Sequence, residues 1–334
     1  MKSNYLIVML ALLASGFMGC SDDDGDNWKK KFEDEQEKIK EFVYSKDADP
    51  KVFAYHYSYL KEDIEDYAYL FNYQKEGKKA TYGDFVWVNY TQKSLTGSII
   101  DSSDPSVAIG TGVSPYYTLG GPILLQMNTD AEKYIDPLSD ILMNIPEGTT
   151  GSSIVSSIMS LSSTLVYRDY TVERIVETNS LLDYENDMIG RYIEGNGLEV
   201  FKEVRLHEEK ADTIAFIVKT KENVSGTPVQ ATDSVTVWAE GRILDELNTS
   251  LRQFLKMDSD NEAKWYLPDM IKGVALTLPE LRVGEEATIL FSSGMGYGYR
   301  GLRNYDGTYV IPAYSTLLFK VKIIDTKENS KNDK

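Results

Sequence analysis

Cysteine and histidine are nearly absent from this 334-residue sequence, which contains one cysteine, Cys20, and two histidines. A single cysteine excludes an intrachain disulfide. Two histidines without a second cysteine give little support to a metal site, and we expect no metal and no cofactor. We expect His56, which lies among tyrosines, to be a packing residue, and His207, next to Glu208 and Glu209, to lie on the surface.

Positive charge is also scarce. The sequence has 35 Lys and Arg against 52 Asp and Glu, so the formal net charge is −17. Such a surface repels phosphate groups, which argues against a nucleic-acid partner. No arrangement of residues points to a catalytic nucleophile or to a phosphate-binding loop.

A long hydrophobic run is missing as well. Tyr5–Ala14 is apolar but too short to span a membrane comfortably, and with Lys2 before it we interpret residues 1–19 as a signal peptide. Residues 16–20 (GFMGC) resemble a bacterial lipobox, with Phe17 and Met18 in place of the commonest residues. The resemblance implies diacylation of Cys20 and stable membrane anchoring. The alternative is a structural cysteine that follows an ordinary signal peptide.

An acidic run, Ser21–Asp26, follows Cys20 directly. It resembles the surface-export signal of Bacteroidota lipoproteins, which implies a lipoprotein exposed on the outer face of the outer membrane. The alternative interpretation is a solvated spacer, because runs of acids are usually linkers. Residues 20–27 are therefore expected to form an acidic linker.

The next residues, 28–67, are expected to be a helical N-terminal segment. Trp28–Tyr44 keeps an apolar stripe among Lys and Glu, which predicts a helix that Asp49-Pro50 ends. Val52–Phe71 is rich in tyrosine, and we expect it to begin as helix and end as strand.

Two stretches about 149 residues apart then show the same pattern of strand, turn, acidic turn residue and strand. A helix-like segment precedes each, which predicts two copies of one domain rather than a solenoid. The expected strands are Tyr69–Gln74 and Phe85–Thr91 in the first copy, and Thr213–Thr220 and Ser234–Gly241 in the second.

The most informative stretch is Arg282–Asp325. Glu286–Ser292 and Ser315–Ile324 have strand composition, and between them lies a glycine-rich loop that carries Tyr297. The matches Gly284-Glu285, Gly296-Tyr297-Gly298, Ile311-Pro312-Ala313 and Thr316–Phe319, in this order, resemble the C-terminal part of the FKBP-type peptidyl-prolyl isomerases. The alternative is a generic β-hairpin with a glycine-rich loop.

The resemblance implies an α+β fold with two tandem FKBP-like domains, each an antiparallel β-sheet wrapped on a short helix. The implied boundaries are 68–178 for a first, degenerate domain and 205–327 for a second. A helical linker, 179–204, is expected between them, and a disordered tail, 328–334, after them.

In the second copy the resemblance implies an apolar cup, with the Tyr297 hydroxyl donating to a substrate carbonyl. Ala239, Asn248 and Val274 stand where the family has Tyr, Asp and Trp, which is expected to widen the cup. For each aliphatic residue, ordinary core packing is the alternative. The implied catalytic residues are Leu247, Met270, Ile271, Val274, Tyr297, Ile311 and Phe319.

The first copy keeps the polar pair of the family, Tyr90 and Asp101, with Ile100 in place of Phe. It has no Gly-Tyr-Gly and no Ile-Pro, so its flap is expected to be deleted or rebuilt. The second candidate pocket implied by the resemblance comprises Tyr90, Ile100, Asp101, Ile135 and Leu138.

The predicted function is a monomeric peptidyl-prolyl cis-trans isomerase of low activity. Its expected partners are proline-containing polypeptides, in the folding of exported proteins, and the membrane that holds its lipid anchor. The first alternative is a non-catalytic FKBP-like surface lipoprotein that binds polypeptides or other surface partners. A glycan-binding lipoprotein ranks behind both, because only the many Tyr and Trp residues suggest it.

Overall fold

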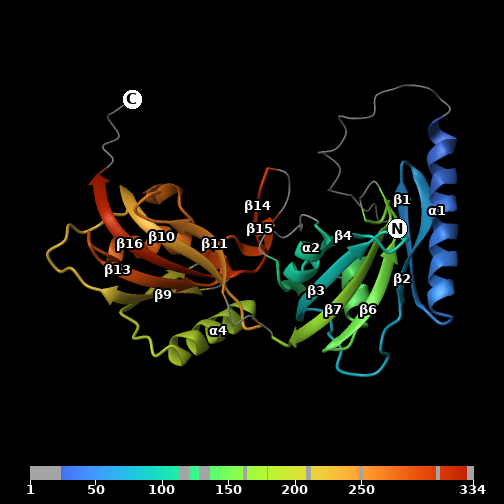
Figure 1. Ribbon diagram of the computed structural model, residues 1–334, viewed down its shortest axis with the longest axis horizontal. Helices are drawn as coiled ribbons and strands as arrows, with labels where there is room; N and C mark the ends of the chain where they lie inside the picture. Colours follow the sequence, from blue (N-terminus) through green and yellow to red (C-terminus); the bar gives the residue numbers. More distant parts are fainter. Residues whose placement is uncertain are drawn as a thin grey trace, which may run out of the picture.

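The computed structural model describes residues 24–112, 120–127, 136–160, 164–178, 180–207, 212–247, 251–305 and 309–328. The chain forms two sheet units in succession, a first unit within residues 24–178 and a second within residues 180–328 (Figure 1). Each unit holds a seven-stranded sheet. The predicted α+β class, with antiparallel sheets and an N-terminal helix, is confirmed.

The elements of the first unit are α1 (Asp24–Lys46), β1 (Lys51–Tyr59), β2 (Glu62–Phe71), β3 (Phe85–Lys93), β4 (Ile99–Ser102), α2 (Pro105–Thr111), β5 (Ile123–Gln126), α3 (Pro137–Leu142), β6 (Thr149–Val155) and β7 (Val166–Val176). Those of the second unit are α4 (Leu181–Gly195), β8 (Lys202–His207), β9 (Asp212–Lys221), β10 (Asp233–Leu244), β11 (Arg252–Met257), β12 (Ala263–Tyr266), α5 (Lys272–Thr277), β13 (Glu286–Phe291), β14 (Leu302–Arg303), β15 (Tyr309–Ile311) and β16 (Thr316–Glu328).

Both large sheets have the same strand order. It is β1-β2-β6-β7-β3-β4 in the first unit, where β5 also pairs with β3. It is β8-β9-β13-β16-β10-β11 in the second unit, where β12 also pairs with β10. A longer helix, α1 or α4, precedes each sheet, and a short helix, α3 or α5, precedes the strand β6 or β13. Apart from α2 in the first unit and β14–β15 in the second, one order of helices and strands is therefore repeated along the described chain.

Helix α1 covers one face of the first sheet. Its residues Ile39 and Val43, one helical turn apart, are fully buried and pack with Tyr69 and Phe71 of β2. The helix predicted over Trp28–Tyr44 is confirmed, and it extends beyond both ends of that prediction.

The segment Val52–Phe71 is a β-hairpin, so the expectation of a helical start, and of a helical segment 28–67, is wrong. In β1 the half-buried Phe53, Tyr55, Tyr57 and Tyr59 alternate with exposed residues, which is the period of a strand. The exposed residues include His56, so its expected packing role is also wrong, whereas His207 is exposed as expected. The turn residues Leu60 and Lys61 both have positive φ (48° and 71°), as tight hairpins require.

Helix α4 is part of the second unit rather than a linker. Met188 and Ile189 are buried against Leu290 of β13 and Leu318 of β16. The Ser180 side chain caps the helix by accepting from the Asp183 N–H. Because β8 begins at Lys202 and β2 at Glu62, the expected boundaries at 204/205 and 67/68 each cut through a strand.

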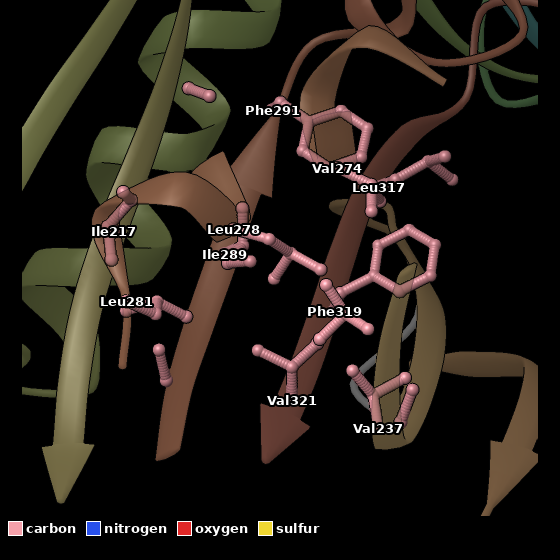
Figure 2. Packing of buried hydrophobic residues seen from close by; sticks show 14 of the residues in the cluster. Ile217, Val237, Val274, Leu278, Leu281, Ile289, Phe291, Leu317, Phe319 and Val321 are labelled. Carbon is pink, nitrogen blue, oxygen red and sulfur yellow. The ribbon is translucent and has the colours of Figure 1, made fainter. Parts of the chain in front are cut away.

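The largest core lies in the second unit, where one face of the sheet packs on α5 (Figure 2). Val274 and Leu278 meet Ile289, Phe291, Leu317 and Phe319 there.

Among the described residues, no helix has the length and apolar character that a membrane crossing needs.

Candidate functional site

The connection between β13 and β16, residues 292–315, is called the flap. It contains two short 3-10 turns, Ser293–Met295 and Gly298–Arg300, and the small sheet β14–β15. Gly301 has φ +62°, and a Cβ there would lie 2.4 Å from the Ile311 carbonyl oxygen, so only glycine fits. The predicted pattern of strand, glycine-rich loop and strand is confirmed.

Six of the seven residues implied by the resemblance in the second unit meet in one apolar cluster. Val274, Ile311 and Phe319 are at most 3% exposed and belong to the core. Met270, Ile271 and Tyr297 are half-buried and pack against that core. The buried residues therefore form a floor, and a ligand would contact the half-buried residues.

Tyr297 differs from the other members of the cluster because it carries a polar group. Burial raises the pKa of its hydroxyl. Within the described part of the chain, this hydroxyl makes no hydrogen bond. A phenolic hydroxyl both donates and accepts, so it is available to a ligand carbonyl.

Two aromatic residues that the sequence did not indicate flank this cluster. The rings of Phe254 in β11 and Trp265 in β12 meet the Phe319 ring edge-on, with centroids 5.5 and 6.3 Å away. Gly241 makes room for Phe254, because a Cβ at Gly241 would lie 2.6 Å from its ring. The glycine within β10, two residues after Ala239, was the only available signal of this close packing.

Leu247 lies away from the apolar cluster, so its assignment to the cup is corrected. It packs with Phe85, Trp87, Leu124 and Val176 of the first unit. It follows β10 at the point where the two units meet, and contacts between distant segments decide its place. Asn248 lies outside the described residues.

In the first unit the predicted polar pair is brought together. The Tyr90 hydroxyl donates to Asp101 Oδ2 at 2.5 Å, and both residues are buried. Leu138 packs against the cluster that contains Tyr90. Ile100 is 48% exposed because its neighbour Asp101 points inward and successive strand residues face opposite sides. Ile135 lies outside the described residues.

Arg168 is a further member of this first-unit group that the sequence did not indicate. Its guanidinium lies 5.1 Å from the Tyr90 ring centroid. Its Nε and Nη2 both donate to Gln92 Oε1, at 3.1 and 2.9 Å. This region of the first unit is therefore occupied by a polar network.

The connection between β6 and β7 in the first unit has no strand among its described residues, 156–160 and 164–165. Ser156 Oγ donates to the buried Asp66 carboxylate at 2.5 Å. The N–H and Oγ of Ser157 donate to Glu35 Oε1 of α1, at 2.7 and 3.0 Å. The start of this connection is thus held against α1 and β2.

Metal-ligating side chains do not gather among the described residues of either unit. Over the parts of the chain that the structure describes, no three His, Cys, Asp or Glu side chains are grouped as a metal site would require.

Comparison with protein families gives one match. Residues 225–324 match the family described as FKBP-type peptidyl-prolyl cis-trans isomerase. The matched range contains β10 to β15 and most of β16, and with them the apolar cluster, Tyr297 and the flap. The match supports an FKBP-type isomerase domain at the level of the family. A comparison with curated proteins finds no match.

Three solved structures are similar to this chain at low identity. A peptidyl-prolyl cis-trans isomerase from Pseudomonas syringae pv. tomato is 16% identical with a TM-score of 0.32, and the similarity covers 45% of this chain and 99% of that one. FkpA from Escherichia coli is 18% identical with a TM-score of 0.32, covering 44% and 61%. The three FKBP domains of wheat FKBP73 are 12% identical with a TM-score of 0.31, covering 79% and 95%. This chain therefore spans less than two thirds of the FkpA chain.

Proposed function

We propose that the second unit is a peptidyl-prolyl cis-trans isomerase domain of FKBP type that acts on proline-containing polypeptides and assists the folding of exported proteins. One observation carries the proposal. Within the range that matches the family, a half-buried tyrosine, Tyr297, lies against a wholly apolar cluster, and its hydroxyl makes no hydrogen bond to the described residues.

The chemistry of prolyl isomerisation suits such a site. Rotation about the X-Pro bond has a barrier of about 20 kcal/mol, because resonance gives the C–N bond partial double-bond character. The twisted transition state loses this resonance and is less polar than the planar amide. Apolar surroundings therefore favour the twisted state, and a hydroxyl such as that of Tyr297 stabilises it by donating to a substrate carbonyl. No covalent intermediate is required.

The test is a prolyl-isomerisation assay on the full chain, with Tyr297→Phe and Tyr299→Phe as a matched pair. The Tyr299 hydroxyl accepts a hydrogen bond from Arg300 Nε, and its side chain is 64% exposed. We expect the wild type to accelerate isomerisation. Tyr297→Phe should lower kcat/KM about fivefold to tenfold, the value of one neutral hydrogen bond. Tyr299→Phe should leave kcat/KM unchanged, and equal losses in both variants would contradict the role of Tyr297.

A second candidate is a non-catalytic domain that binds polypeptide segments. It is favoured by the replacements Ala239 and Val274 at the positions where the resemblance places Tyr and Trp. The same assay separates the two candidates. A wild-type chain that binds a proline peptide in titration calorimetry but leaves its isomerisation rate at background would establish binding and exclude catalysis.

We further propose that the first unit is a degenerate copy of the same fold. Its strand order, equal to that of the second unit, supports this assignment. A crystal structure of the full chain tests it by superposition of the two sheets, since a copy requires that β3, β6 and β7 overlay β10, β13 and β16.

The proposed location is the outer membrane, with Cys20 as the lipid-bearing residue and the acidic run after it as the surface-export signal. The sequence pattern alone supports this, because Cys20 lies outside the described residues. Cys20→Ala should move the protein from the membrane fraction to the soluble fraction. A variant that stays in the membrane fraction would contradict lipid anchoring, and protection of the native protein from protease added to intact cells would contradict surface exposure.

A further inference from the structure

We propose that the first unit positions the loop that carries Tyr297, and that Phe85 and Gln126 act as positioning residues through Tyr314. The inference depends on the proposed function only for its catalytic consequence. The contacts themselves are properties of the fold and can be measured without any substrate.

Tyr314 links the Tyr297 loop to the rest of the flap. Its backbone N–H donates to the Gly298 carbonyl at 2.9 Å, which closes the loop one residue after Tyr297. The φ of Tyr314 is 56°, in the left-handed region that non-glycine residues rarely adopt. A strained residue of this kind persists only where its surroundings fix it.

The first unit supplies those surroundings. The Tyr314 ring meets the Phe85 ring edge-on, with centroids 5.4 Å apart and an interplanar angle of 86°. The Tyr314 hydroxyl also donates to Gln126 Oε1 at 3.3 Å. Phe85 is only 4% exposed and belongs to β3, so it presents a rigid surface to Tyr314.

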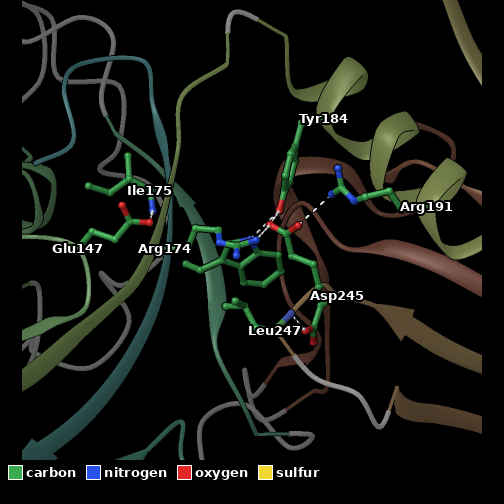
Figure 3. A network of polar contacts seen from close by, with 9 residues as sticks. Glu147, Arg174, Ile175, Tyr184, Arg191, Asp245 and Leu247 are labelled. Atoms are coloured by element: carbon green, nitrogen blue, oxygen red, sulfur yellow. Dashed lines mark hydrogen bonds and ion pairs between the residues drawn. The ribbon is translucent and has the colours of Figure 1, made fainter. Parts of the chain in front are cut away.

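Several further contacts hold the two units together around this point. The Glu246 carboxylate of the second unit pairs with Arg174 of the first at 2.9 Å. It also pairs with Arg191 at 2.9 Å and accepts from the Tyr184 hydroxyl at 2.5 Å (Figure 3). Trp87 Nε1 of the first unit donates to the same Tyr184 hydroxyl at 2.8 Å. The contacts of Glu246 and Tyr184 and the ring contact between Phe85 and Tyr314 therefore form one interface between the units, which is called the joint.

A hydrogen bond from Arg252 to Gly120 also joins the two units. Arg252 Nη1 of the second unit donates to the Gly120 carbonyl of the first at 2.5 Å. The same guanidinium pairs through Nη2 with the buried Asp245 at 3.1 Å, so its position is fixed. A joint held at several separate points keeps Phe85 in place beside Tyr314.

The first unit therefore contributes to the Tyr297 site through its contacts with Tyr314, and this role does not require a binding site in the first unit. It holds Tyr314 in a strained conformation, and Tyr314 holds the Gly298 end of the Tyr297 loop. Loss of the Phe85 ring should let Tyr314 relax and widen the range of Tyr297 positions, which lowers kcat with little change in KM.

The experiment measures amide hydrogen exchange of the full chain in Phe85→Leu and in a matched control, Phe71→Leu. Phe71 is a fully buried phenylalanine of the same unit, packed beside α1 instead of at the joint. We expect the Tyr314 amide to lose about threefold to tenfold protection in Phe85→Leu, as for the loss of one aromatic contact, and to keep it in Phe71→Leu.

A second variant serves if Phe85→Leu does not fold. In Tyr314→Asn the backbone can keep its left-handed φ while the ring and its contacts with Phe85 and Gln126 are lost. The amide at position 314 should then lose protection to a similar extent, because its hydrogen bond to the Gly298 carbonyl opens more often.

Each outcome decides the inference. Unchanged protection of the amide at position 314 in the variant that folds would overturn it, whatever the activity. Reduced protection with an unchanged kcat in an active enzyme would overturn the positioning role. A wild-type chain without isomerase activity would remove the proposed function, while the exchange measurement would still decide whether the first unit fixes the loop.

Discussion

In the second unit Gly241 of β10 pairs with Phe319 of β16, whereas in the first unit Gln92 of β3 pairs with Arg168 of β7. Both strand pairs have a register irregularity upstream, just before Val237 in one and just before Val88 in the other. Counting from these irregularities, Ala239 corresponds to Tyr90 and Phe319 to Arg168. The same backbone positions therefore carry apolar packing in one unit and a polar network in the other.

The connections that follow β6 and β13 also differ, with polar contacts in the first unit and an apolar surface in the second. In the first unit, Ser156 and Ser157 are tied to Asp66 and Glu35. In the second unit, the flap extends into β14 and β15 and carries Tyr297 against an apolar floor. One strand order can therefore support a fixed structural unit or a candidate site, depending on a few side chains and one connection.

The largest effect is expected from placing arginine, the residue at position 168 of the first unit, at the corresponding position 319 of the second unit. Phe319→Arg would put a charge among Phe254, Trp265 and Phe291 without a partner. An unpaired buried charge costs several kcal/mol, so we expect a loss of about 3–5 kcal/mol in the free energy of unfolding and no isomerase activity. Chemical denaturation measures the first quantity.

The control for this variant is Lys320→Arg, at the exposed neighbouring position of β16. It should change the free energy of unfolding by less than about 0.5 kcal/mol. Wild-type stability in Phe319→Arg would show that the apolar character of this position is not needed.

The next effect concerns Glu185 of α4, which is buried, whereas Glu35 of α1, which makes the corresponding contact with Ser157 in the first unit, is half-buried. Its Oε1 accepts from the Ser293 N–H at 2.8 Å and from Thr316 Oγ1 at 3.0 Å, at the two ends of the flap. Burial raises the pKa of this carboxyl from 4.5 to about 7. Because the folded protein holds this proton more tightly than the unfolded chain, the stability contributed by this group is fully present below pH 4.5 and is lost as the pH rises to 7.

Glu185→Gln should remove this pH dependence. The pKa difference of about 2.5 (7 minus 4.5) corresponds to about 3 kcal/mol, which the wild type should lose relative to the variant between pH 4.5 and pH 7. Denaturation at several pH values measures it, with Glu194→Gln, an exposed glutamate of the same helix, as the control. Parallel stability curves for wild type and Glu185→Gln would contradict the burial of a titrating carboxyl.

A smaller effect tests the first unit's polar pair. Tyr90→Phe removes the hydrogen bond between the two side chains and Asp101→Asn weakens it, and each should cost about 1–2 kcal/mol of stability. In a double-mutant cycle the two losses should not add, with a coupling of about 1 kcal/mol. Strict additivity would mean that the hydrogen bond contributes nothing.

Much of the fold could be predicted from the sequence, because period and turn chemistry are local. The strands β9, β10, β13 and β16 and the helix α1 were predicted in this way. The hairpin β1–β2 was missed although its tyrosines alternate as in a strand, because its turn, Leu60-Lys61, lacks the glycine or asparagine that usually marks positive φ.

The candidate site was predictable in part for the same reason. Short motifs located Tyr297, Ile311, Phe319 and Val274, which the fold brings together. Arg168 and Leu247 could not be assigned, since the place of the first depends on strand register and that of the second on the contact between the units. Both are decided by segments far apart in the chain.

We propose that the isomerase site lies in the second unit and not in the first. The direct test compares kcat/KM for prolyl isomerisation by the full chain in the wild type, Tyr297→Phe and Tyr90→Phe. We expect a loss of about fivefold to tenfold in Tyr297→Phe and wild-type activity in Tyr90→Phe. A loss in Tyr90→Phe, with Tyr297→Phe as active as the wild type, would contradict it.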